Sequence, residues 1–279
     1  MIPETELRNL ARRLDVDLML LDLDYSLGCF LAGLGQQNLA GLLCFKGATC
    51  LRKCYFPDYR FSEDLDFTAQ GRLTEVALKT IAERAVRWVE REIGLDFTAA
   101  PIRVRTISDE YGKESFEVRL YYRGPLSRTG SPRAVRLDVT RDETLIFPCE
   151  ARSILHPFSD QSQVAATLIP TYSLQEILAE KIRAIAGQRR FAISRDLYDI
   201  HQLLERGVDL SAVLPILPIK FEVKGLHIEN VHVSDLEARR PEFEADWRRR
   251  LTYLLPRSQS ASFEDAWEAA IQIIKQIGE

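Results

Sequence analysis

The chain has 279 residues, of which 46% are hydrophobic and 28% charged, and its formal net charge is -4. This composition is ordinary for a folded protein of one large or two modest domains, and it excludes intrinsic disorder. No apolar run reaches the roughly 18 residues of a membrane span, and the opening "MIPETELRNLARR" lacks the basic-then-apolar order of a secretory signal, so we expect a cytoplasmic protein with no membrane partner.

The apolar periodicity of the first half predicts helices alternating with strands. Helices are expected over residues 4–13 and 16–35, followed by the buried strand "LAGLLCFKG", the short helix "ATCLRKCYF" and the strand "DLDFT". The amphipathic segment "LTEVALKTIAERAVRWVEREIG" predicts a long helix that ends at Gly94. Three half-buried strands then follow in "PIRVRTI", "SFEVRLYYRG" and "RAVRLDVT", and the turn "GPLSRTGSP" makes the last two an antiparallel hairpin.

After about residue 165 the pattern indicates four capped helices. Ser173, with Glu176 three residues on, forms a capping box, and Ser194 and Ser262 occupy similar N-cap positions. We therefore expect an α/β (α+β) fold, in which a mixed sheet flanked by helices occupies residues 1–165 and a helical bundle occupies residues 166–279.

The five cysteines do not follow a zinc-binding pattern. They are odd in number and contain no Cys-x-x-Cys pair, which predicts reduced, mostly buried thiols. They are Cys29, Cys44, Cys50, Cys54 and Cys149.

Two acids lie close together on the strand "DLDFT". Because side chains at i and i+2 of a strand point the same way, Asp64 and Asp66 share one face while Leu65 and Phe67 pack into the core. Neighbouring carboxylates repel each other unless a cation lies between them, and magnesium prefers such ligands together with substrate phosphates. The alternative is a pair of exposed acids on an edge strand.

The residues before these acids predict an anion site. Gly47, Ala48 and Thr49 join a strand to a helix whose first N–H groups point at whatever lies above the strand end. Gly47 lets the backbone come close to a phosphate, and Lys53, one helical turn beyond Thr49, adds a positive charge.

A third acid can converge on the first two. In "VRLDVT" the apolar residues alternate with polar ones, so Asp138 lies on the polar face of its strand. An anion site next to a cluster of carboxylates is what nucleotidyl transfer requires, because a metal must hold the triphosphate while an acid helps to position the attacking hydroxyl.

Charged residues also stand out in the helical half. Lys181 falls inside an apolar stripe, four residues after Ile177, where a lysine seldom lies without a partner; the alternative is a lysine that snorkels at the edge of the stripe. We expect Lys181→Ala to weaken nucleotide binding without destabilising the fold, because an unpaired buried ammonium is costly. Asp196 and Asp199 share a face of the next helix, and Arg195 can form a mere surface ion pair with Asp199.

Six arginines and a single acid lie between residues 118 and 141. Arg119, Arg123 and Arg136 are on the hairpin that carries Asp138, which predicts a path for RNA phosphates toward the acids. The alternative is a solvated face that only balances the acidic remainder of the surface.

Three parts of the chain, between about residues 42 and 204, resemble the AbiEii/MenT-like nucleotidyltransferase toxins of prokaryotic toxin–antitoxin systems. They are "FKGATCLRKCY" with "RFSEDLDF", then "VRLDVT", then "AEKIRAI" with "SRDLYDI". The first pair resembles the Gly-Gly/Ser signature and Asp-x-Asp metal site of polymerase-beta-like nucleotidyltransferases, although Ala48 stands where a second glycine or a serine is usual.

The resemblance implies a nucleotidyltransferase-type sheet and roles for particular residues. Asp64, Asp66 and Asp138 would bind Mg²⁺, Lys181 would contact the triphosphate, and Asp199 would lie near the base, the metal or the acceptor. The other residues that would bind the nucleotide are Gly47, Ala48, Thr49, Lys53, Arg60, Ser62, Arg195 and Asp196.

The implied activity is magnesium-dependent transfer of a nucleoside monophosphate from an NTP to an acceptor hydroxyl. The acceptor would be RNA, above all a tRNA 3′ end, or else a protein side chain; a cognate antitoxin would be a partner, and phage defence a biological role. The alternative is a nucleotide-binding protein of the same fold that lacks transferase activity and acts through protein contacts. The presence of all three acids favours the enzyme.

Overall fold

The computed structural model describes residues 1–108, 114–126 and 132–278, and its backbone packs as two compact units. Unit 1 comprises Met1–Glu143 and Cys149–Thr171, and unit 2 comprises Thr144–Pro148 and Tyr172–Glu279. The predicted boundary at residue 165 falls before the last strand of the sheet, which continues through Thr171.

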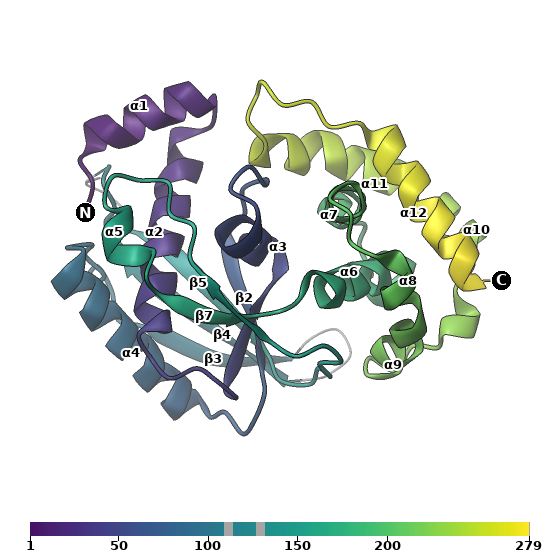
Figure 1. Ribbon diagram of the computed structural model, residues 1–279, viewed down its shortest axis with the longest axis horizontal. Helices are drawn as coiled ribbons and strands as arrows, with labels where there is room; N and C mark the ends of the chain where they lie inside the picture. Colours follow the sequence, from purple (N-terminus) through teal and green to yellow (C-terminus); the bar gives the residue numbers. More distant parts are fainter. Residues whose placement is uncertain (109–113, 127–131, 279) are drawn as a thin grey trace. The chain divides into compact units, whose positions relative to one another are not determined.

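Unit 1 is built on a seven-stranded mixed sheet in the order β3-β4-β5-β2-β1-β7-β6 (Figure 1). β2 pairs in parallel with β5, β1 pairs in parallel with β7, and the other neighbours are antiparallel. The predicted class, a mixed sheet with flanking helices, is confirmed, as is the antiparallel pairing of β4 with β5. The strands are β1 (Leu43–Lys46), β2 (Asp64–Ala69), β3 (Arg103–Ser108), β4 (Glu114–Tyr122), β5 (Arg133–Thr140), β6 (Glu150–Ser153) and β7 (Leu168–Thr171).

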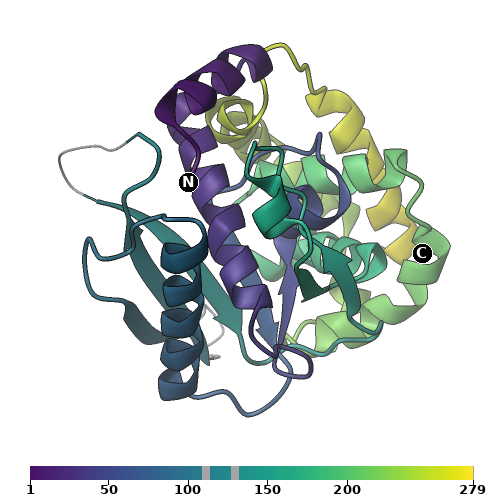
Figure 2. The same cartoon turned by 60° about the vertical axis from the view of Figure 1, so that its left-hand side comes forward.

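Helices α2 and α4 lie side by side over one face of this sheet (Figure 2). The apolar side chains of β4 and β5 are buried, whereas the alternate residues on the opposite face are polar and partly exposed, as the period of two predicts. The helices of unit 1 are α1 (Glu4–Leu14), α2 (Leu18–Gly35), α3 (Gly47–Cys50) with its π-helical continuation η1 (Leu51–Tyr55), α4 (Glu75–Glu92) and α5 (Gln161–Val164).

Among the described residues, α2 alone is long and apolar enough to cross a membrane by length and composition. The expectation that no segment reaches that length was therefore wrong. The helix lies largely inside unit 1, with 83% of it buried, and it carries the buried acids Asp22 and Asp24. Such burial is typical of a core helix.

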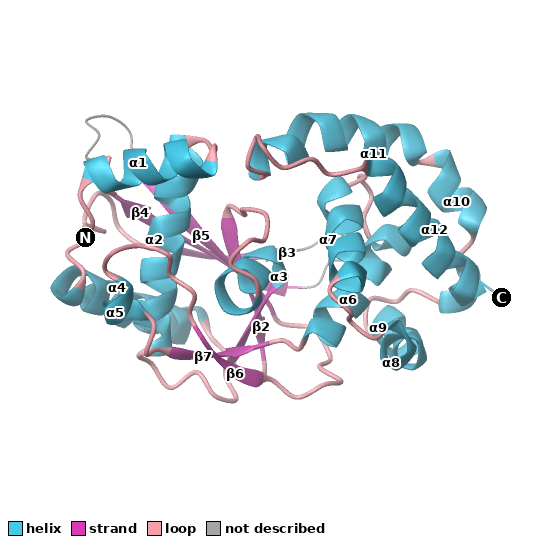
Figure 3. Ribbon diagram, turned by 45° about the horizontal axis from the view of Figure 1, so that its top comes forward, coloured by secondary structure: helices cyan, strands magenta, loops and turns pink. Residues whose placement is uncertain are grey.

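Unit 2 consists of helices and loops in its described part (Figure 3). They are shorter and more numerous than the four that the sequence indicated, because several are interrupted by π-helical or 3₁₀ turns. The elements are α6 (Leu174–Arg183), η2 (Ala184–Gln188), α7 (Ser194–Glu205), α8 (Leu210–Val213), η3 (Leu214–Ile216), α9 (Leu217–Glu222), η4 (Ile228–Asn230), α10 (Val233–Ala238), α11 (Arg240–Asp246), η5 (Trp247–Leu251), η6 (Thr252–Leu254) and α12 (Phe263–Gly278).

The predicted helix caps fare differently from one another. Ser173 accepts a hydrogen bond from the backbone N–H of Glu176, and the hydroxyl of Ser262 accepts one from the N–H of Asp265, so both N-caps are confirmed. The reciprocal half of the capping box was wrong, because the Glu176 carboxylate accepts instead from the N–H groups of Ile146 and Phe147 and from Lys220. The Ser194 cap was wrong: this serine is the first residue of α7, and both its N–H and its hydroxyl donate to the carboxylate of Asp246. The predicted hairpin turn between β4 and β5 lies partly outside the described residues, which omit 127–131.

The cysteines depart from the prediction of five reduced thiols. Cys44 on β1 and Cys149 form a disulfide, with a Cα–Cα distance of 6.5 Å, across a sequence separation of 105 residues. The remaining three, Cys29, Cys50 and Cys54, are free and buried, as expected. The pairing could not be foreseen because it depends on where the chain returns to the sheet after β5.

Candidate active site

The three predicted acids meet on the open face of the unit 1 sheet. β2 and β5 are adjacent and parallel, and their register places Asp66 opposite Asp138 and Asp64 opposite Arg136. Residues that are paired across neighbouring strands point to the same face, so strand geometry brings Asp64, Asp66 and Asp138 to one surface.

Arg136 lies between two of these carboxylates. Its guanidinium is 2.5 Å from Asp64 Oδ2 and its Nε is 3.0 Å from Asp138 Oδ2. Burial raises the pKa of Asp138 to about 6; Arg136 lowers it, and the charge of Asp64 raises it further. The pKa of Arg136 is itself raised, because the charges of the three acids outweigh the effect of burial. The acids therefore form an electrostatically crowded group that needs a cation.

The turn before α3 packs directly against this group. Gly47 has a φ of +80°, and a Cβ at this position would lie 2.5 Å from Asp66 Oδ2, so a larger residue is excluded both by backbone conformation and by space. Thr49 Oγ1 donates to the backbone carbonyl of Asp64 at 2.5 Å, and Ser62 Oγ donates to Asp64 Oδ1 at 3.3 Å. Gly47, Ala48, Thr49 and Ser62 are thus grouped with the acids.

The donor chemistry of this group suits a hard divalent cation, because it offers three carboxylates from two adjacent strands. In the described part of the chain, no set of three His, Cys, Asp or Glu side chains is arranged so that it could hold a metal ion as it stands. At this site the Arg136 guanidinium bonds to Asp64 and Asp138. Asp64, Asp66 and Asp138 are the residues that would hold the metal once Arg136 moves.

Two of the predicted nucleotide-binding residues are engaged elsewhere within unit 1. The Lys53 ammonium is 2.8 Å from Asp24 Oδ2 on α2, and both side chains are 1% exposed. Burial lowers the pKa of Lys53, although Asp24 counteracts this. Arg60 is also buried, and it donates to the carbonyl of Phe61 at 3.1 Å. Lys53 is therefore engaged with α2 inside the core of unit 1.

In unit 2, Lys181 joins the two predicted acids of α7. Its ammonium is 2.6 Å from Asp196 Oδ1 and 2.8 Å from Asp199 Oδ2, and Arg189 Nε lies 3.1 Å from Asp196 Oδ2. Burial opposes ionisation of Asp196, but Arg189 and Lys181 outweigh it and hold the pKa of Asp196 below its usual value. The expectation that Lys181 is unpaired was therefore wrong. Arg195 is half-buried on the same helix.

Sequence reasoning missed two of these partners. The sequence predicted Arg136 only as a contact for RNA and did not single out Arg189. For Arg136, the signal was its spacing of two residues from Asp138 on the same strand. Its approach to Asp64 depends on pairing between strands far apart in sequence, which spacing does not reveal.

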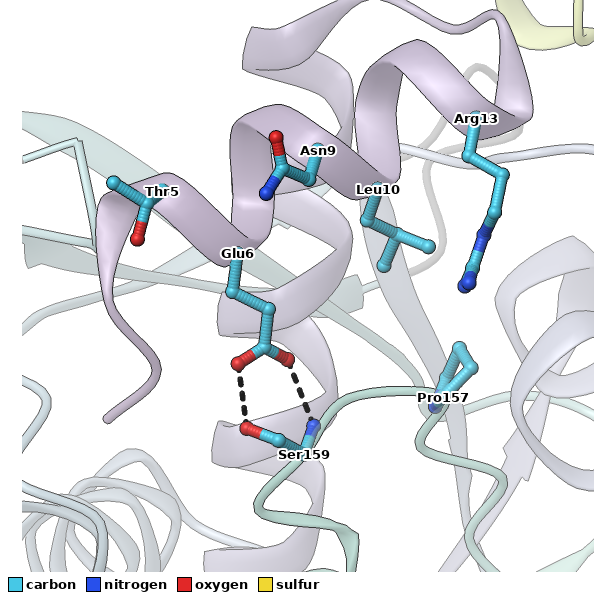
Figure 4. A pocket seen from close by; sticks show the side chains of 7 residues that line it. All are labelled: Thr5, Glu6, Asn9, Leu10, Arg13, Pro157 and Ser159. Carbon is cyan, nitrogen blue, oxygen red and sulfur yellow. Dashed lines mark hydrogen bonds between the residues drawn. The ribbon is translucent and has the colours of Figure 1, made fainter.

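A separate pocket of about 540 Å³ lies beside α1 (Figure 4). Its charged lining residues are Glu6 and Arg13, and the Glu6 carboxylate already accepts hydrogen bonds from the N–H and hydroxyl of Ser159. This pocket offers no cluster of carboxylates comparable to the one on β2 and β5.

A mixed sheet that presents carboxylates from two adjacent strands beside a glycine turn defines a nucleotidyltransferase-type protein. The chain is similar to MenT4, a nucleotidyltransferase toxin from Mycobacterium tuberculosis, with 21% identity and a TM-score of 0.59. The similarity covers 100% of each chain. It is also similar to JHP933 from Helicobacter pylori, with 15% identity and a TM-score of 0.57, over 94% of this chain and 93% of the other. At these identities the likeness shows the fold alone.

The family follows from a sequence model. Residues 29–269 match the model of the nucleotidyl transferase AbiEii toxin of type IV toxin–antitoxin systems. None of the curated proteins compared with the chain matches it. The chain belongs to the AbiEii nucleotidyltransferase toxin family, which confirms the resemblance of its motifs.

Proposed function

We propose that this protein is a magnesium-dependent toxin that transfers a nucleoside monophosphate from an NTP to the 3′ end of a tRNA. The observation that carries the proposal is the convergence of Asp64, Asp66 and Asp138 on one sheet face beside Gly47. As in the family, a cognate antitoxin is the expected partner. The expected location is the cytoplasm.

Each group of residues then has a definite task. Asp64, Asp66 and Asp138 would hold Mg²⁺, which when bound neutralises charge on the triphosphate. Gly47 lies against the Asp66 carboxylate, and its lack of a side chain would let a phosphate approach the backbone beside the metal site. Lys181, held by Asp196 and Asp199, serves the nucleotide as a positively charged contact.

A labelling experiment tests the proposal. The protein is incubated with magnesium, each radiolabelled NTP in turn, and total RNA, and the labelled polymer is identified. Asp64→Asn and Asp66→Asn should abolish transfer while leaving the melting temperature within a few degrees, because partly exposed acids contribute little to folding. Glu63→Gln is the matched control, since Glu63 is exposed and adjoins Asp64 but does not belong to the acid group.

The outcomes separate the alternatives. Transfer that persists in both Asn variants would refute the assignment of the acids. NTP binding without label on any polymer would favour the alternative function, a nucleotide-binding protein that acts through protein contacts. Label on protein instead of RNA would retain the transferase and reject the tRNA acceptor.

A further inference from the structure

Three arginines form one row across the open face of the unit 1 sheet. The register pairs Arg103 on β3 with Arg119 on β4, Arg119 with Arg136 on β5, and Arg136 with Asp64 on β2. We call Arg103, Arg119 and Arg136 the arginine row. Because neighbouring strands are about 4.8 Å apart, the row covers roughly 10 Å and ends at the acid group.

Such a row opposes folding. Like charges directly opposite each other on adjacent strands are destabilising, and here three arginines are consecutive. All three are exposed, so no buried structural need explains them. Arg119 has an acid on its own strand, because Glu117 binds its guanidinium through two contacts of 2.9 and 3.0 Å, and Arg136 contacts the acid group itself. The unfavourable proximity of these positive charges would be relieved by a bound polyanion, so the row is suited to bind one.

The outer end of the row also offers an aromatic surface. The Arg103 guanidinium lies over the ring of Tyr121, 5.5 Å from its centroid. Unpaired bases at RNA ends stack on aromatic rings and arginine planes, which a protein acceptor does not require. The combination of arginines in register with Tyr121 therefore favours single-stranded RNA over a protein segment.

Arg136 is the member of the row whose partners must change. It is 44% exposed and is bonded to both Asp64 and Asp138, which are also the residues proposed to hold the metal. A guanidinium and a divalent cation compete for the Oδ2 atoms of these two carboxylates. When the cation binds, Arg136 loses its two partners and its charge becomes available to a phosphate.

We propose that the arginine row binds the phosphates of the acceptor RNA and that Arg136 joins it only when a divalent cation occupies the acid group. This rests on the proposed function and adds to it a regulated acceptor site: metal and RNA bind with positive coupling. Positive coupling means that magnesium should increase the affinity for RNA. Magnesium ordinarily weakens the binding of proteins to RNA because it competes for the phosphates, so tighter binding in its presence requires a specific cause.

The test measures the affinity for a 5′-fluorescein-labelled tRNA by anisotropy, without NTP, with and without magnesium at constant ionic strength. Arg103→Ala and Arg119→Ala should each make the slope of log affinity against log salt concentration shallower by about 0.7. Relative to the wild type, each variant should therefore lose roughly fivefold more affinity at 0.1 M salt than at 1 M. Arg84→Ala, on α4 over the opposite face, is the matched control and should leave affinity unchanged.

Arg136→Ala should remove the gain in affinity that magnesium causes in the wild type and leave the magnesium-free affinity nearly unchanged. Asp64→Asn should instead raise the magnesium-free affinity, because it releases Arg136 from one of its partners. If magnesium affects Arg136→Ala and the wild type equally, or if the row variants bind like Arg84→Ala, the inference is wrong.

A labelling assay on the same preparations distinguishes this failure from failure of the proposed function. Transfer to tRNA, combined with row variants that bind like the control, overturns the arginine row and leaves the function standing. Transfer to protein, or no transfer at all, overturns the proposed function whatever the row variants do.

Discussion

Replacing Lys181 with methionine removes the ammonium that lies 2.6 Å from Asp196 and 2.8 Å from Asp199. The carboxylates are 2% and 0% exposed and the lysine 13%, so the group is screened little by water. Breaking a buried ion pair by removing one partner costs about 3–5 kcal/mol. Because Arg189 still contacts Asp196, we expect Lys181→Met to lower the free energy of unfolding by about 3 kcal/mol, at the lower end of that range.

Urea unfolding followed by circular dichroism measures this loss. Lys79→Met is the control, since Lys79 is 53% exposed and its ion pair with Glu83 is 4.0 Å long, and it should change stability by less than about 0.5 kcal/mol. Adding Asp199→Asn to Lys181→Met should restore part of the loss, because it removes a carboxylate left without its ammonium. A Lys181→Met protein as stable as the wild type would show that the ion pairs do not form in solution.

Three further outcomes follow from unit 1. Gly47→Ala should cost about 1–2 kcal/mol of stability and abolish label transfer, because its Cβ would meet the Asp66 carboxylate and its φ is +80°; a fully active variant would contradict this. Burial lowers the pKa of His156, so the free energy of unfolding should fall by at most about 1.4 kcal/mol per pH unit as the pH decreases below 6.5. His156→Gln should make this dependence on pH weaker in thermal melts, and an equal dependence in the variant and the wild type would refute the prediction. Thiol titration in denaturant without reductant should count three thiols in the wild type and four in Cys149→Ser, which frees Cys44; five in the wild type would exclude the disulfide.

The face on which each acid lies could be predicted from sequence, whereas its partners could not. Period-two alternation is local, so "DLDFT" and "VRLDVT" already determine which side chains point away from the core. Placing Asp138 next to Asp66 requires that β5 pair with β2, although α4, β3 and β4 intervene in the chain. That pairing is decided by the packing of the whole sheet.

Lys53 shows how a local irregularity changes a side chain's direction. Regular α-helical spacing puts Lys53 on the same side as Thr49. The chain instead continues from α3 into the π-helical turn of Leu51–Tyr55, which has more residues per turn than an α-helix and rotates the residues within it. Within this turn Lys53 faces Asp24, an acid inside the apolar helix α2 that was not among the predicted site residues.

The two groups of acids differ in how readily their internal cation can be exchanged for a ligand. Arg136 is 44% exposed and bonds carboxylates that are themselves partly exposed, so water can solvate it once it leaves them. Lys181 is 13% exposed and lies against carboxylates that are almost fully buried. If Lys181 were displaced, a cation from solvent would have to replace its charge. That cation would lose its hydration on entering so buried a site, which is costly. The exchange of an internal cation for a metal is therefore favoured at Asp64 and Asp138 over Asp196 and Asp199, where Lys181 keeps its carboxylates.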